Sequence, residues 1–165
     1  MPSKRPVLDV AIIGGGVDTY TKLMLHMDGV DAGTTFTDSV GTHTVTAVGT
    51  AQTDTAQAKF GVSSGLLDGN SDYLTIPDHA DFNMGTGTVT IDFWVRFNSV
   101  ATSQTIFYQE TDATHYVYFT WSVANLLAFK IQDGAGALID KTASFTPVVN
   151  TWYHIALIRG WGGNA

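Results

Sequence analysis

The stretch TVTIDFWVRF at residues 88–97 alternates in side-chain character with a period of two along its whole length. One face carries apolar side chains at every second position from Val89 to Phe97, and the other face carries Asp92, Trp94 and Arg96. A period of two indicates a β-strand, because successive side chains of a strand point to opposite faces of its sheet. Large side chains on both faces predict a central strand that is covered on both sides, at least in part.

Two further segments repeat this pattern, THYVYFTWSV at 114–123 and TWYHIALIR at 151–159. Both are rich in the β-branched and aromatic residues that are enriched in strands. Gly, Asn and Asp interrupt the chain at short intervals, and no segment has the length and period of a substantial helix. The predicted fold is all-β, a two-sheet antiparallel jelly-roll β-sandwich.

Turn residues locate the expected hairpins. Asp68-Gly69-Asn70 predicts a hairpin between two short strands within residues 60–77, and Asp133-Gly134 predicts another within residues 126–140. One helical turn is expected at TAQAKFG, residues 55–61, with Thr55 as its cap.

The run DVAIIGGGVDTY at residues 9–20 has the outline of a dinucleotide-binding turn but lacks its context. Gly14 and Gly16 fit the first two glycine positions, whereas Thr19 occupies the third and Asp18 places a negative charge where a phosphate would lie. No helix follows to bind the pyrophosphate. We therefore expect no nucleotide cofactor, and interpret the glycines as a flexible joint.

Residues 1–22 are predicted to form an extended N-terminal arm, and residues 23–165 the sandwich. The arm contains two of the four prolines, the triple glycine and a set of apolar side chains, namely Val7, Leu8, Val10, Ile12 and Ile13. Because apolar side chains are costly to leave in water, the arm is expected to anchor the chain on another subunit. The alternative is a flexible N-terminal segment.

The end of the chain, TWYHIALIRGWGGNA, has a strand and a glycine-rich turn but no following partner strand. We expect the sandwich to be truncated there, which leaves an open edge that favours pairing with another chain and predicts a homo-oligomer. The start of the chain has no recognisable cleavage site, so no signal peptide is expected.

Charge and composition exclude several classes of function. The formal net charge is -7 and the eight Lys and Arg residues are scattered, which argues against a nucleic-acid partner. The absence of cysteine excludes disulfides and thiolate chemistry. No apolar run approaches the roughly 20 residues that a membrane span requires. The five histidines are widely separated in sequence, and none is expected to pair as a metal ligand.

Calcium is the metal that the sequence favours, because calcium prefers several hard oxygen ligands. The segment HMDGVDAGTTFTDSVG supplies Asp28, Asp31 and Asp38 in a glycine-containing loop region. The alternative is that these residues make local turn hydrogen bonds. A weaker second candidate set is Asp68, Asp72, Asp78 and Asp81.

Four stretches together resemble the laminin-G-like, concanavalin-A-like jelly-roll domains, in particular those on surface proteins of bacteriophages and marine bacteria. They are LMLHMDG, GTTFTDSVGTHTVTA, AQAKFGVSSGLLDGNSDYLTIPDHADFNMGTGTVTIDFWVRF and NTWYHIALIR, within residues 23–159. The resemblance implies a mostly non-catalytic domain that binds glycans or proteins, or that serves as a structural module. It also implies that Asp38 and the carbonyls around Gly41 lie near an edge where some members hold structural calcium.

Glucanases that share this sandwich carry several carboxylates at alternate positions of one strand. The matching strand here offers only Asp92, so hydrolysis is not expected, and Asp92 is expected to pair with Arg96 or with a crossing strand. Glycan binding would use exposed aromatic side chains, for which the candidates are Trp94, Tyr108, Tyr116, Tyr118, Trp121 and Trp161. Trp161, in the terminal turn, is the one most expected to be exposed, and the alternative for all six is a place in the core.

The function predicted first is that of a non-enzymatic structural and adhesion module on the surface of a phage virion, as a head decoration or fibre protein. Its arm would bind other virion proteins. The alternative is a calcium-dependent carbohydrate-binding module of a secreted bacterial protein at an extracellular surface. A glycosidase is the third and weakest hypothesis.

Overall fold

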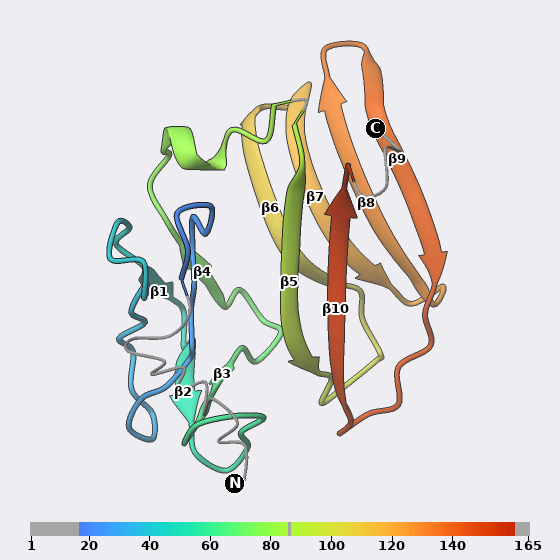
Figure 1. Ribbon diagram of the computed structural model, residues 1–165. Helices are drawn as coiled ribbons and strands as arrows, with labels where there is room; N and C mark the ends of the chain where they lie inside the picture. The colour runs from blue at the N-terminus through green and yellow to red at the C-terminus, as the bar shows by residue number, and fades with distance from the viewer. Residues whose placement is uncertain (1–16, 86, 161–165) are drawn as a thin grey trace, which may run out of the picture. The chain divides into compact units, whose positions relative to one another are not determined.

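The computed structural model describes residues 17–85 and 87–160, and the chain divides into two compact units, residues 1–86 and 87–165 (Figure 1). Throughout the described residues every strand pair is antiparallel. The helical element of these residues is a single 3-10 turn, η1 (Ala80–Phe82). The all-β prediction is therefore confirmed. The predicted anchor residues of the arm, Val7 to Ile13, lie outside the described residues.

In the unit 87–165, the described residues 87–160 form two sheets. The first pairs β5 (Val89–Arg96) with β10 (Trp152–Arg159). The second has the order β6-β7-β8-β9, built from β6 (Gln104–Asp112), β7 (His115–Ser122), β8 (Leu126–Asp133) and β9 (Gly136–Ser144). In Figure 1, β5 and β10 lie in front of the four-stranded sheet. The three strands predicted from alternation, at 88–97, 114–123 and 151–159, are all present.

Aromatic side chains fill the space between these two sheets. The ring of Phe93 on β5 meets Phe119 on β7 edge to face, with 5.7 Å between their centroids. Phe97, directly after β5, contacts Trp121 of β7 at 5.3 Å. Trp121 is only 1% exposed, and its indole N–H donates a hydrogen bond of 3.0 Å to the carbonyl of Phe145. Because the inner faces of both sheets meet in this core, the unit is the predicted two-sheet antiparallel sandwich.

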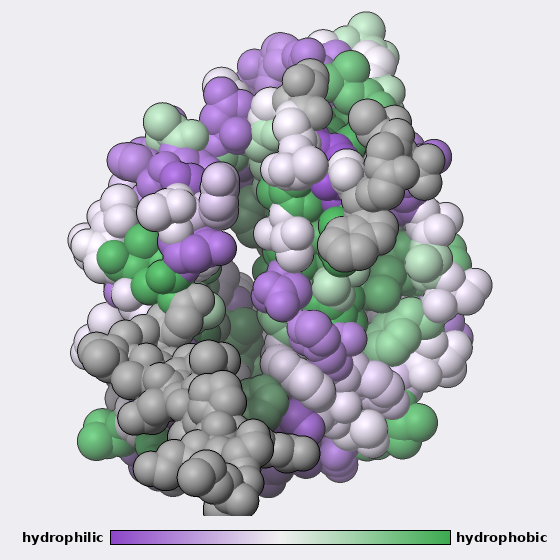
Figure 2. All heavy atoms as spheres, viewed as in Figure 1, coloured by the Kyte–Doolittle hydropathy of each residue, from purple (hydrophilic) through white to green (hydrophobic). Residues whose placement is uncertain are grey.

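Figure 2 shows that the face of the molecule viewed in Figure 1 mixes hydrophilic and hydrophobic residues. Such a mixture is typical of strands whose outer face meets solvent.

The hairpin predicted at Asp133-Gly134 is confirmed, since β8 and β9 pair from Asp133–Gly136 to Leu126–Ser144. Gly134 has a φ of +63°, a conformation that glycine adopts without strain.

Within residues 17–85, the described part of the unit 1–86, four short strands form two ladders, β1 with β4 and β2 with β3. These strands are β1 (Thr46–Val48), β2 (Gln52–Asp54), β3 (Ser64–Leu66) and β4 (Tyr73–Thr75). Thr53 is completely buried in this unit, and its hydroxyl donates to the carbonyl of Val30 at 2.6 Å. Phe36 and Ala51 are also buried here.

The hairpin predicted around Asp68-Gly69-Asn70 is wrong in its pairing. Both strands exist, but β3 pairs with β2 and β4 pairs with β1. The cause is the Asp72 carboxylate, which accepts the backbone N–H groups of Thr50 at 2.6 Å and of Asp68 at 3.0 Å. The bond to Thr50 holds the wide loop between β3 and β4 against the turn between β1 and β2. The strands β3 and β4 therefore pair with β2 and β1 and not with each other.

The helical turn predicted at residues 55–61 is also wrong. The chain there forms a turn and bends without a helix. The backbone N–H of Thr55 donates to Asp31 at 3.2 Å, and that of Ala56 donates to Asp54 at 2.8 Å. Hydrogen bonds from this backbone to the carboxylates of Asp31 and Asp54 thus hold the segment in a turn, a local alternative to helix that Asp side chains commonly provide.

Candidate functional site

Three tyrosines, Tyr108 on β6 with Tyr116 and Tyr118 on β7, lie on one face of the four-stranded sheet. Tyr108 stands directly opposite Tyr118 in the register of the two strands. Phe119 and Trp121, which alternate with these positions on β7, are buried in the core. Because side chains alternate across a strand, the tyrosines project from the opposite, outer face. We call this surface the tyrosine face.

The rings of the tyrosine face are close together and nearly parallel. Tyr116 and Tyr118 have centroids 5.9 Å apart and planes inclined by only 10°. Tyr108 and Tyr116 are 6.5 Å apart and inclined by 26°. Tyr108 is 52% exposed, and the other two are half-buried. The three rings therefore form a continuous aromatic surface that solvent and ligands can reach.

Charged groups border this surface and bind the tyrosine hydroxyls. The hydroxyl of Tyr108 donates a 2.6 Å hydrogen bond to Glu110, and this bond raises the pKa of Tyr108. Lys130 of β8 lies 5.7 Å from the ring centroid of Tyr116, and a hydrogen bond to Tyr116 raises the pKa of Lys130. At neutral pH the face thus combines neutral aromatic rings with an acceptor and a cationic donor. This combination suits a ligand that has both apolar faces and hydroxyl groups.

The other aromatic candidates take different places. Trp121 is a core residue, as the alternative interpretation held. Trp94 of β5 is 39% exposed and stacks on His154 of β10, with 5.1 Å between centroids and 19° between planes. Trp161 lies outside the described residues. The tyrosine face is therefore the place where the structure gathers several of the predicted aromatic candidates.

Asp38, a predicted calcium ligand, is buried and accepts four backbone hydrogen bonds. Its Oδ1 atom accepts from Met24 and Val40 at 3.1 and 3.0 Å, and its Oδ2 atom accepts from Thr42 and His43 at 3.2 and 3.1 Å. Burial by itself would raise the pKa of Asp38, but these N–H donors together hold it below its usual value. Asp38 thus fixes the loop around itself through local hydrogen bonds.

The remaining predicted calcium ligands do not converge on Asp38 through their side chains. The carboxylate of Asp28 accepts the N–H of Val62 at 3.2 Å. Gly41 has a φ of +80° and donates its N–H to the carbonyl of Asp38 at 2.9 Å. Within residues 17–85 and 87–160, Asp28 and Asp38 do not gather with a third His, Asp or Glu side chain. Calcium binding by these residues stays a prediction.

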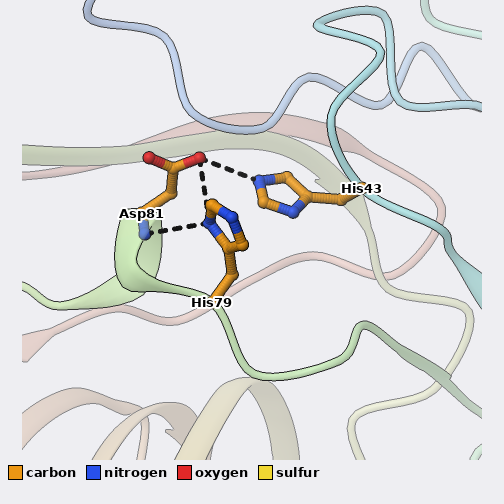
Figure 3. A group of neighbouring side chains, drawn as sticks. All are labelled: His43, His79 and Asp81. Atoms are coloured by element: carbon orange, nitrogen blue, oxygen red, sulfur yellow. Dashed lines mark hydrogen bonds and ion pairs between the residues drawn. The ribbon is translucent and has the colours of Figure 1, made fainter.

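Two of the five histidines, which are far apart in sequence, lie close together in the structure. His43 and His79 meet at Asp81, and their ring centroids are 4.9 Å apart (Figure 3). Sequence spacing could not show this group, since 36 positions separate the two histidines and only the fold brings them together. From sequence, Asp81 belongs only to the second candidate calcium set, which consists of aspartates alone.

Comparison with known proteins identifies the family. Residues 68–165 match the sequence profile of the family described as the concanavalin A-like lectin/glucanases superfamily. This chain belongs to that superfamily. The resemblance predicted from the four sequence stretches is thereby confirmed.

A solved structure supports the fold of this superfamily member. The chain is similar to an S-layer domain-containing protein from Clostridium thermocellum, with a TM-score of 0.58 and 22% sequence identity. The alignment covers 78% of this chain and 58% of the other, so the chain spans little more than half of that structure's length. Likeness at this identity concerns the fold alone. No curated protein matched the chain.

The superfamily name covers both lectins and glucanases. The carboxylates on β5, the strand that matches the carboxylate-bearing strand of the glucanases, therefore bear on whether this chain could hydrolyse a glycoside. Asp92 of β5 lies 3.2 Å from the Nε2 atom of His154 on the neighbouring strand β10. Arg96 instead binds Asn98. The partner of Asp92 is therefore a residue of the adjacent strand in its own sheet, and neither Arg96 nor a crossing strand. Among the described residues of this superfamily member, no helix has both the length and the apolar character needed to cross a bilayer.

Proposed function

We propose that this chain is a non-enzymatic adhesion module that binds carbohydrate through the tyrosine face. The observation that carries the proposal is the parallel arrangement of Tyr116 and Tyr118 beside the exposed ring of Tyr108, on the side of the sheet away from the core. Aromatic rings in such a position add nothing to the sandwich core, which Phe119 and Trp121 fill from the opposite face.

The chemistry of the face fits a sugar. The apolar faces of sugar rings stack on aromatic side chains, while their hydroxyl groups need hydrogen-bond partners of both kinds. Glu110 supplies an acceptor and Lys130 supplies a donor within the same surface. A membrane-like or purely apolar ligand would make no hydrogen bond with either Glu110 or Lys130.

Binding without hydrolysis is the proposed mode of action. Acid–base cleavage of a glycoside requires two carboxylates placed on either side of the bond. Asp92 is the one carboxylate that the β5 strand offers, and it is engaged with His154. The proposal therefore assigns recognition and adhesion to this chain, and no turnover.

Mutation of the tyrosine face tests this proposal, with Tyr73 as the matched control. Tyr108→Ala is expected to weaken binding to the best oligosaccharide from a glycan array by about tenfold, equivalent to about 1.4 kcal/mol. Tyr73 of β4 is also 52% exposed, so Tyr73→Ala removes an equally accessible ring elsewhere. Equal loss in both variants, or no saturable glycan binding by the native chain, would refute the carbohydrate role. Isothermal titration calorimetry provides the affinities.

We further propose that the module lies on the surface of a virus particle, where residues 1–22 attach it to other virion proteins. The support is the resemblance of its sequence stretches to phage surface domains. The competing location is a secreted bacterial protein that binds glycans with calcium.

Sedimentation of native material separates these two locations. The expected result is that peptides of this chain, followed by mass spectrometry, migrate with large particles and remain there after a salt wash. Deletion of residues 1–21 should abolish that association and leave the sandwich folded. Recovery only as a small free species would contradict the virion location and favour the secreted module.

A further inference from the structure

Three side chains that the proposed function does not use, His43, His79 and Asp81, meet in the unit of residues 1–86. His43 follows the loop that Asp38 organises, and its backbone N–H donates to that carboxylate. His79 precedes η1, where its Nδ1 atom accepts the backbone N–H of Asp81 at 3.2 Å. Figure 3 shows the rings of His43 and His79 and the carboxylate of Asp81 directed toward one another.

His43 has a buried nitrogen without a hydrogen-bond partner. Its side chain is only 3% exposed and packs against the ring of Phe82, with 4.6 Å between centroids. The Nε2 atom makes no hydrogen bond, although it points at Asp81 from 3.4 Å. A buried polar atom without a partner is costly, and natural structures keep one mainly where a function or an ion accounts for it.

The separations of the three atoms fit a small tetrahedral cation. The Oδ2 atom of Asp81 lies 3.4 Å from Nε2 of His43 and 3.1 Å from Nδ1 of His79. With metal–ligand bonds of about 2.1 Å, neighbouring ligands of a tetrahedral zinc ion lie about 3.4 Å apart. Two of the three spacings are thus already close to this value, and all three ligand atoms lie within 4.8 Å of one another.

The donor atoms decide the class of metal. Two imidazole nitrogens and one carboxylate oxygen are typical zinc ligands, and three protein ligands leave the fourth position to water. Calcium instead requires six to eight oxygen ligands. We propose that His43, His79 and Asp81 form a binding site for a divalent cation of the zinc class.

Two existing contacts must change when the metal binds. The Nδ1 lone pair of His79 would turn from the N–H of Asp81 to the metal, which the half-exposed ring can do by rotation. Lys22 contacts Oδ1 of Asp81 at 3.5 Å and leaves Oδ2 to the two histidines. Its side chain is 51% exposed and can withdraw into solvent from an incoming cation. This inference does not depend on the carbohydrate proposal, whose residues all belong to the other unit.

Calorimetric titration of the full, chelator-treated chain with ZnCl₂ tests the site. The expected result is saturable uptake of one zinc ion, undiminished by excess CaCl₂. His79→Ala and Asp81→Asn should each weaken uptake by at least the roughly 10–100-fold that follows when a residue that only hydrogen-bonds to a metal ligand is lost. The matched control is His26→Ala, which removes another exposed histidine of the same unit and should leave uptake unchanged.

Imidazole ¹⁵N NMR provides a readout that does not depend on the variants folding. Zinc should shift Nε2 of His43 and Nδ1 of His79 in the native chain, while His26 keeps its signals. If the contact with Asp81 alone accounts for the buried Nε2 atom of His43, no zinc uptake will be seen. Absent uptake, shifts confined to other histidines, or an equal loss in His26→Ala would each overturn the site. Carbohydrate binding by a chain that fails this test would leave the proposed function intact.

Discussion

Trp121→Ala is expected to lower the free energy of unfolding by about 3–5 kcal/mol, the range for truncating a large buried aromatic residue. Trp121 is 1% exposed and packs against Phe97, so its removal leaves a cavity between the two sheets. The carbonyl of Phe145 also loses its hydrogen-bond donor. Urea unfolding followed by far-ultraviolet circular dichroism measures the change without relying on tryptophan fluorescence.

Two further variants separate the contributions of packing and hydrogen bonding. Trp121→Phe keeps most of the buried ring and loses the indole N–H, so a smaller loss of about 1–3 kcal/mol is expected. Trp94→Ala removes a tryptophan that is 39% exposed and should cost less than Trp121→Ala. A loss below about 1 kcal/mol for Trp121→Ala would mean that the aromatic core between β5 and β7 does not hold the sandwich together.

Asp38→Ala is expected to lower the free energy of unfolding by at least about 3 kcal/mol. The substitution leaves the backbone N–H groups of Met24, Val40, Thr42 and His43 without their acceptor. Hydrogen bonds to a charged acceptor contribute roughly 1.5–3 kcal/mol each, and water can replace only some of them at a buried site. Asp38→Asn should cost less, because its amide keeps one of the two oxygen acceptors.

The contribution of Asp38 should also depend on pH in a defined direction. The folded state lowers the pKa of Asp38, so its ionised form stabilises the fold at every pH above the unfolded pKa of about 3.9. This stabilisation is lost as the pH falls through the lower, folded pKa. The difference in stability between native chain and Asp38→Asn should therefore be constant at neutral pH and shrink in acid. A difference that grows below pH 4 would contradict the hydrogen-bond pattern described here.

Alternation and turn chemistry predicted β5, β7, β8, β9 and β10 of the unit 87–165, but not β6 (Gln104–Asp112). Residues 88–97 have apolar side chains at every second position, and the Asp133-Gly134 turn joins strands that do pair with each other. The turn at Asp68-Gly69-Asn70 gave the wrong pairing, because the carboxylate of Asp72 binds Thr50, 22 positions away in sequence. Local turn residues carry no information about such a distant contact.

The candidate sites show the same limit. Asp38 was singled out from sequence as an oxygen ligand, yet its oxygens accept four backbone N–H groups that no pattern of residue types reveals. The tyrosines at 116 and 118 share a strand face by their spacing of two, so their proximity was predictable, but Tyr108 joins them only through the register of β6 and β7. His43 and His79 meet only after folding.

The most direct test of the proposed adhesion role is to observe the tyrosine rings while carbohydrate binds. In an NMR titration with the best oligosaccharide from the array, the ring signals of Tyr108, Tyr116 and Tyr118 should shift together and saturate at one ligand concentration. The ring signals of Tyr73, which is as exposed as Tyr108, should not shift. Saturable binding that leaves the three tyrosines unshifted and perturbs other residues instead would contradict the proposal that this face is the binding site.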